Sequence, residues 1–168
     1  MIVSRTEILQ KALKAYSAYY DVTESKIGEP FVAEAEFRSH NDTYFLVKRA
    51  KLGEAESNEF VFFVSVESLD LEELNRLAET AWTEGISRVR PHESHKNTDI
   101  SLVLLADRVS KDAKKRARTL KYYKSYKLGL HGFSHFQLIA FETSTSEILK
   151  NKMGHNLKSI FSKIIRTT

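Results

Sequence analysis

The sequence predicts a single α+β domain over residues 1–168, in which helices pack against a mostly antiparallel sheet of five strands. Three observations support this fold class. The chain has 168 residues and is 42% hydrophobic, which suits one domain with a sizeable core. Strand patterns follow one another in the first half, and helical and strand patterns alternate in the second half. The predicted order is α-β-β-β-α-β-α-β-α.

The first half begins with a predicted helix over 4–20, because Ser4 and Glu7 have the spacing of a capping box. Strand patterns follow at 31–38, 43–52 and 59–67. The first of them alternates between apolar and polar residues, which indicates one buried face and one wet face. The third is apolar on both faces at its middle, which predicts a central strand. Short turns join the three and favour an antiparallel meander.

The second half alternates helices and strands. Asp70 and Glu73 form another capping box, which predicts a helix that ends near Gly85. The segments that follow are a polar loop over 88–97 containing Pro91, a strand over 99–106, a basic helix from Ser110 to about Tyr123, a strand over 133–142, a turn over 143–146, and a last helix from about Gly154.

Composition excludes several classes of protein. The chain has no cysteine, so it holds no disulfide, no cysteine-ligated zinc and no thiol nucleophile. This fits a reducing cytoplasm. The N-terminus does not resemble a signal peptide, and no apolar run approaches the length of a membrane span. We therefore expect a soluble, cytoplasmic protein without a membrane partner.

Charge is distributed unevenly along the chain. Residues 1–110 hold 19 acidic and 13 basic side chains, whereas residues 111–168 hold 3 acidic and 13 basic ones. The basic excess is greatest in the predicted helix and the segment after it, where Tyr122, Tyr123 and Tyr126 are interleaved with lysines. Lysine stripes with aromatic neighbours are typical of sites that bind phosphate backbones. The candidate residues for a polyanion or nucleic-acid surface are Lys115, Arg118, Lys121, Lys124 and Lys127.

Two other interpretations of this basic stripe stay open. A charged helix face often contributes solubility alone, with its tyrosines packed inward. The stripe could also meet an acidic protein partner. If the basic segment is helical as predicted, its cations can line one face of the helix. Four of them follow one another at helical spacing: Lys114, Arg118, Lys121 and Lys124.

The histidines and a lysine supply a second candidate site. A pocket for a small enzyme or ligand-binding protein would combine Lys48, His92, His95, His131 and Asn151. The spacing of His92 and His95 is one residue short of a helical His-Glu-x-x-His motif, and the preceding proline indicates a loop. We therefore predict no metal site and no cofactor.

The α-β-β-β-α-β order resembles the core of the restriction-endonuclease-like superfamily. That family holds a divalent metal with an acid on its second strand and a Glu-x-Lys or Asp-x-Lys triplet on its third. Asp42 opens the second predicted strand here, but Val61 stands where the lysine is required. The resemblance therefore concerns topology and does not carry the nuclease site.

Four short motifs resemble a family of uncharacterised bacterial proteins. They are YFLVKRA at 44–50, PHESH at 91–95, KSYKLGLHG at 124–132 and NKMG at 151–154. The resemblance implies a stand-alone domain of unknown function and brings no activity with it. It directs attention to Lys48, His92, His95, Lys124, Lys127 and Asn151.

The sequence leaves the biological function unknown and favours a binding domain over an enzyme. The first hypothesis is a non-enzymatic domain whose basic surface binds nucleic acid or another polyanion. The alternatives are a small enzyme or ligand-binding protein with a His/Lys pocket, and a homo-oligomeric or protein-interaction module whose acidic and basic faces pair.

Overall fold

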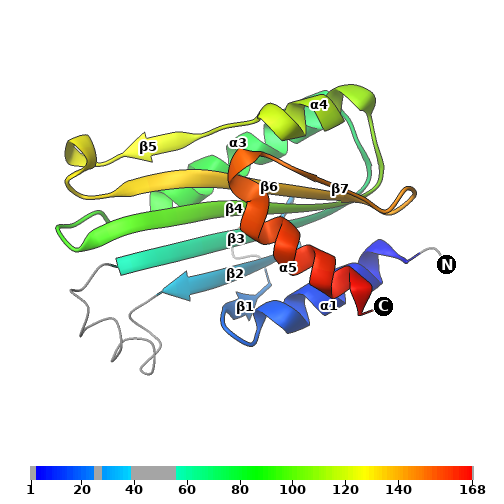
Figure 1. Cartoon of the computed structure of the whole chain (residues 1–168), viewed down its shortest axis with the longest axis horizontal. Helices are drawn as coiled ribbons and strands as arrows, with labels where there is room; N and C mark the ends of the chain where they lie inside the picture. Colours follow the sequence, from blue (N-terminus) through cyan, green and yellow to red (C-terminus); the bar gives the residue numbers. More distant parts are fainter. Residues whose placement is uncertain (1–2, 25–27, 39–55, 168) are drawn as a thin grey trace.

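The computed structural model describes residues 3–24, 28–38 and 56–167 of the chain (Figure 1). Within these residues, seven strands form one mixed sheet with the order β1-β2-β3-β4-β6-β5, and β7 also pairs with β6. The strands are β1 (Asp21–Thr23), β2 (Ala33–Arg38), β3 (Glu56–Leu69), β4 (His95–Val109), β5 (Tyr123–Ser125), β6 (Phe133–Glu142) and β7 (Glu147–Lys150). The α+β class is confirmed.

The predicted number and direction of the strands are wrong. Strands β1, β2 and β3 form an antiparallel meander, but β3 and β4 are parallel, and so are β4 and β6. The helices α3 (Leu71–Arg88) and α4 (Lys111–Thr119) connect these parallel strands. Helix α3 carries the chain back to the end of the sheet where β3 began, and α4 followed by β5 does the same after β4, so the next strand runs in the same direction. The alternation of helix and strand in the second half is therefore the sign of parallel pairing.

Local signals in the sequence identified the helix starts correctly. Ser4, Asp70 and Ser110 each accept a hydrogen bond from the backbone N–H three residues later, as their N-cap positions require. Helix ends were placed less well. Helix α1 (Arg5–Tyr16) is shorter than predicted, and α4 ends at Thr119 rather than near Tyr123.

Two kinds of difference from the predicted elements are seen in the described residues. The polar segment predicted as a loop over 88–97 contains the start of β4, which begins at His95. The short strands β1, β5 and β7 were not predicted, because each has only three or four residues and too little alternation to recognise. The predicted strand over 43–52 lies outside the described residues.

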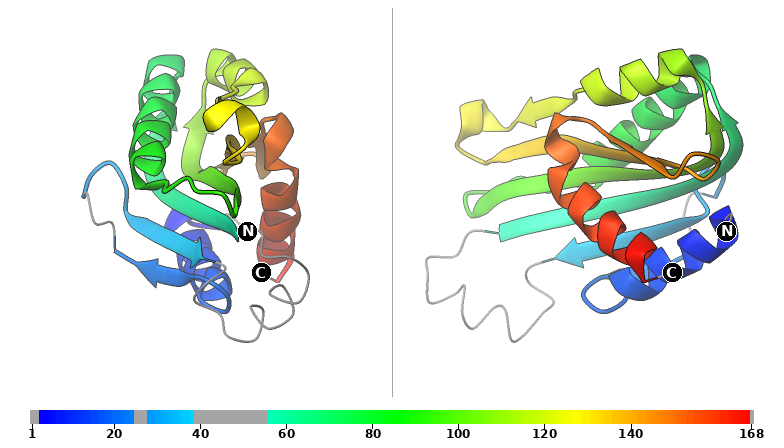
Figure 2. Two further views of the ribbon diagram at one scale, coloured as in Figure 1. Left: turned by 90° about the vertical axis from the view of Figure 1, so that its left-hand side faces the viewer. Right: turned by 45° about the vertical axis from the view of Figure 1, so that its right-hand side comes forward.

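Helices cover both faces of the sheet (Figure 2). Helices α3 and α4 pack on one face, against buried side chains such as Phe60 and Leu102, and α1 and α5 (His155–Arg166) pack on the other, against Val61 and Val103. Adjacent residues of β3 are thus buried on opposite faces, which confirms the prediction of a central strand. No helix in the described residues is long and apolar enough to cross a membrane.

The outer edge of β6 is shared by two short strands. Strand β5 pairs with the beginning of β6 and β7 with its end. The side chain of Asn151, which is 1% exposed, fills the break between them. Its Oδ1 accepts the N–H of Leu138 at 2.9 Å, and its Nδ2 donates to the carbonyls of Phe136 at 2.9 Å and Leu120 at 3.0 Å. One amide therefore joins β6, the end of α4 and the segment after β7.

Replacing Asn151 with alanine should destabilise the domain by about 3 kcal/mol, because it leaves buried backbone groups without partners. Urea unfolding measures the change. The matched control is Asn156→Ala on the exposed side of α5, which should change the free energy of unfolding by less than about 0.5 kcal/mol. Equal stability of the Asn151 variant and the wild type would contradict this role.

Candidate functional site

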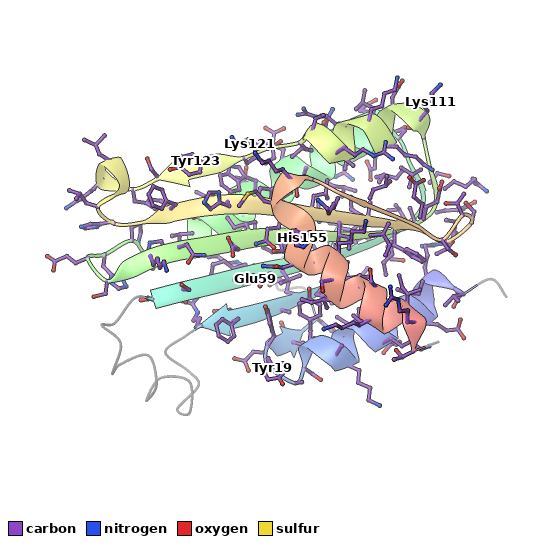
Figure 3. The ribbon with its side chains drawn as sticks, viewed as in Figure 1. Tyr19, Glu59, Lys111, Lys121, Tyr123 and His155 are labelled. Atoms are coloured by element: carbon purple, nitrogen blue, oxygen red, sulfur yellow. The ribbon has the colours of Figure 1, made fainter. Side chains whose placement is uncertain are left out.

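Polar side chains line up across three parallel strands on one face of the sheet. Glu59 of β3 is opposite Asp99 of β4, and Asp99 is opposite His135 of β6. Because strand residues in register point to the same face, the three side chains lie side by side. They lie on the face that carries α1 and α5, and we call them the polar row. Figure 3 looks onto this face, which α5 crosses diagonally.

The carboxylate of Glu59 is held by two hydroxyl groups. The Tyr20 hydroxyl donates to Oε2 at 2.5 Å, and the Ser101 hydroxyl donates to Oε1 at 2.8 Å. Burial raises the pKa of Glu59 in spite of these hydrogen bonds, and the neighbouring charge of Asp99 adds to the increase. Burial also raises the pKa of Tyr20, and the negative charge of Glu59 adds to this increase.

The second carboxylate, Asp99, is held by amide groups. The side chains of Gln137 and Asn97 hydrogen-bond to it, and Asn97 in turn accepts a hydrogen bond from the Ser57 hydroxyl at 2.8 Å. Burial raises the pKa of Asp99, and the neighbouring His135 opposes part of this increase. Both acids are therefore fixed in orientation by donors on the same sheet face.

A cleft of about 470 Å³ adjoins the polar row at His135. It opens between the end of α4, β5, β6 and the short 3₁₀ helix η2 (Lys152–Gly154). We call it the basic cleft; its lining residues are Arg118, Thr119, Leu120, Lys121, Tyr123, His135, Asn151, Lys152 and Met153. The ring of Tyr123, with 49% of its surface exposed, lies 5.1 Å from the ring of His135. The cleft thus combines cationic side chains with an apolar wall.

Two cations of the predicted basic stripe are paired with acids. Lys114 donates to Glu142 and to Glu147 at 2.6 Å each, and Arg118 donates to Glu147 at 3.0 Å. Burial alone would raise the pKa of Glu142, but its hydrogen bonds, with that from Lys114 the largest, hold the pKa below the ordinary value. Part of the basic stripe is therefore neutralised where α4 meets β7.

The other predicted basic residues do not share one helix face. Because α4 ends at Thr119, Lys121 lies between α4 and β5, and Lys124 lies in β5. Lys127 begins the 3₁₀ helix η1 (Lys127–Gly129). All three are exposed, as is Lys115 on α4. The predicted single helical stripe is wrong in its geometry, although its cations still lie along one stretch of chain.

The predicted histidine pocket is partly assembled on the opposite face of the sheet. His92 Nε2 lies 2.5 Å from a carboxylate oxygen of Glu56. The buried His95 donates from Nδ1 to the backbone carbonyl of His131 at 2.6 Å, and its Nε2 lies 2.8 Å from the hydroxyl of Thr98. The structure thus brings three predicted histidines near one another, but His131 contributes its backbone rather than its ring.

The remaining members of this predicted pocket are not with the histidines. Asn151 contacts the middle of β6 and the end of α4, where it also lines the basic cleft. Lys48 lies outside the described residues. Among the residues that the structure describes, no three histidine, aspartate or glutamate side chains are grouped closely enough to hold a metal ion.

Comparison with known proteins identifies the family. A family model described as a domain of unknown function, DUF8052, matches residues 4–163. The chain belongs to the DUF8052 family. This confirms the predicted membership of an uncharacterised family. No curated protein and no solved structure matches the chain. The family description names no activity, so the function of this DUF8052 domain is inferred from its site.

The sequence carried an overlooked signal for the polar row in this DUF8052 chain. Asp99 and His135 stand next to the apolar, buried middle of their strands, and charged side chains are rarely found there without a partner. Their alignment depends on the register of three strands, which sequence alone does not provide. Lys152 gave no local signal, because its place in the cleft depends on the path of the chain after β7.

The raised pKa of Glu59 predicts a pH-dependent gain in stability for Glu59→Gln. A carboxyl group with a folded pKa above its unfolded value loses stability as pH rises through the folded pKa. Glutamine removes the charge, its amide oxygen accepts from one hydroxyl group and its amide nitrogen donates to the oxygen of the other, so the variant should be more stable than the wild type at pH 8 by about 1 kcal/mol, or about 2–4 °C in Tm. The difference should vanish below about pH 4.

Thermal unfolding from pH 3.5 to pH 8 checks this expectation. The control is Glu93→Gln, an exposed carboxyl group in the segment before β4, for which the difference in Tm should stay flat. If the difference in Tm between Glu59→Gln and the wild type also stays constant with pH, burial does not disfavour the ionised form of this carboxyl group.

Proposed function

We propose that this domain binds a small anionic molecule in the basic cleft. The observation that carries the proposal is the convergence of Arg118, Lys121 and Lys152, from three segments of the chain, on one cleft of about 470 Å³. Small-molecule sites in proteins commonly measure about 300–1,000 Å³ and combine an apolar lining with a few placed polar groups. The cleft fits this description.

The three cations have different roles in this proposal. Arg118 donates to Glu147 from one guanidinium nitrogen and also lines the cleft. Within the described residues, no acidic side chain forms an ion pair with Lys121 or Lys152, and both are exposed. Lysine ammonium groups bind phosphate and carboxylate groups as point charges. We therefore assign these two lysines to the anion.

The apolar wall of the cleft favours a ligand that carries an apolar portion next to its anionic group. Leu120 is buried beneath the cleft, while Tyr123 and Met153 are partly exposed at it, with 49% and 38% of their surfaces accessible. Burying such surface stabilises a complex by about 25 cal/mol per Å² of apolar area. A phosphate or carboxylate ester with a short apolar portion suits the lining better than a bare inorganic ion.

Removing both lysines should weaken the binding of propyl phosphate by about a hundredfold or more, because each charge-assisted hydrogen bond contributes about 1.5–3 kcal/mol. NMR titration of the wild type and of the Lys121→Ala/Lys152→Ala double variant measures the dissociation constants. The control is Lys111→Ala/Lys158→Ala, which removes two exposed lysines outside the cleft. Equal affinity of the cleft variant and the control would contradict the proposal.

Nucleic acid is a second candidate ligand, favoured by one feature of β5 and η1. Lys121, Lys124 and Lys127 are exposed along this stretch, and the exposed ring of Tyr123 stacks on Phe133 at 5.8 Å between centroids. Exposed aromatic rings between lysines suit unpaired bases and their phosphates. This surface extends beyond the cleft, so the two proposals can be tested separately.

Changing Lys124 and Lys127 to glutamate should weaken the binding of short oligonucleotides and make its salt dependence less steep, because fewer counterions are released. Fluorescence anisotropy with single- and double-stranded probes, from low to physiological salt, measures both effects. The same variant should bind propyl phosphate as the wild type does, since neither lysine lines the cleft. Absence of oligonucleotide binding at low salt would eliminate this second candidate.

A further inference from the structure

We propose that the basic cleft and the polar row form one site for a dipolar ligand, whose anionic group lies in the cleft and whose protonated amine lies against Glu59 and Asp99. This inference rests on the proposed function, because the cleft positions the anionic end. It adds the chemical class of the other end, which the cleft alone does not specify.

The geometry joins the two parts at His135. This residue lines the cleft and is also the last member of the polar row. Asp99 is its neighbour on the next strand, and Glu59 lies one strand further. Adjacent strands are about 4.8 Å apart, so a carboxylate lies about one such spacing beyond the cleft wall. Both acids are partly exposed, so a bound molecule can reach them.

The two acids repel each other and are held in place. Like charges on directly neighbouring strand positions are unfavourable, and the charge of Asp99 contributes to the raised pKa of Glu59. Donors nevertheless orient Glu59 through Tyr20 and Ser101, and Asp99 through Gln137 and Asn97. A cation placed between the two ionised carboxylates relieves their repulsion. Because both side chains are already held in position, little binding free energy is spent on ordering them.

A buried hydroxyl group that is close enough to Glu59 to be affected by its charge gives a second indication of a ligand. Tyr16 is 3% exposed, and within the described residues its hydroxyl has no hydrogen-bond partner. The ring packs edge-on against Tyr20 at 4.9 Å, and the hydroxyl lies within electrostatic reach of the Glu59 carboxylate. Buried polar groups in proteins are nearly always paired. An amine bound at the acids would supply this hydroxyl with an N–H donor.

The charges explain why the second group is an amine rather than another anion. The cleft supplies cations, and the polar row supplies two acids. In the described residues, Glu59, Asp99 and His135 are not grouped closely enough to hold a metal ion. A protonated primary amine has three N–H donors, which matches the acceptors that the carboxylates and the Tyr16 hydroxyl present.

A pair of matched probes tests the inference. Propyl phosphate and 3-aminopropyl phosphate share the phosphate and the three-carbon chain, whose length is comparable to one strand spacing. We expect the wild type to bind 3-aminopropyl phosphate about tenfold more tightly in NMR titrations. Asp99→Asn and Glu59→Gln, made separately, should each reduce this ratio toward one while leaving the affinity for propyl phosphate unchanged. Glu93→Gln should keep the full ratio.

Each outcome supports or overturns a definite statement. Equal binding of the two probes by the wild type would overturn the dipolar ligand and leave the anion site intact. A ratio that persists in both acid variants would overturn the role of the polar row. Failure of both probes to bind at millimolar concentration would overturn the proposed function, and this inference with it. Near-UV circular dichroism verifies that each variant is folded before it is titrated.

Discussion

The parallel register of β3, β4 and β6 is the constraint on which the rest of the structure depends. It aligns Phe60 with Ile100 and Phe136 on the α3 face, so that large apolar side chains form one layer. One position earlier in each strand, the same register aligns Glu59, Asp99 and His135 on the other face. A slip of one residue in β3 or β4 would place a carboxylate in the apolar layer beneath α3, and a slip in β6 would place the His135 imidazole there, each at a cost in solvation. The hydrophobic core therefore enforces the alignment of the polar side chains.

The cleft arises from the way the chain closes this sheet. Two short strands share the edge of β6, and the break between them leaves room beside the end of α4. An open break in a sheet edge leaves backbone donors and acceptors without partners. The amide of Asn151 satisfies these groups, and it can do so because η2 starts directly after it. Lys152 follows this anchor in the chain, so the residue that stabilises the break also positions a cation at its rim.

The sequence predicted the parts of the fold that depend on local patterns. The caps at Ser4, Asp70 and Ser110 were recognisable from neighbouring residues, and the two-faced apolar run of β3 indicated its central place. Parallel pairing was missed because strand direction follows from how a crossover helix packs. For the candidate site, Arg118 and Lys121 were identified as basic residues but assigned to a helical stripe. Glu59, Asp99, His135 and Lys152 were missed, because only the register and the folded edge bring them together.

A sheet face beside its covering helices can carry polar side chains for solubility alone. Solubility is achieved most cheaply by exposed, mobile lysine and glutamate side chains, which keep their full hydration. The acids of the polar row are instead partly buried and fixed by hydroxyl and amide donors, and burial raises the pKa of both Glu59 and Asp99. Two neighbouring acids under these conditions reduce stability rather than increase it. Such local costs are typical of binding and catalytic sites, where polar groups are oriented before the ligand arrives. The arrangement is therefore better explained as a prepared site than as a soluble surface.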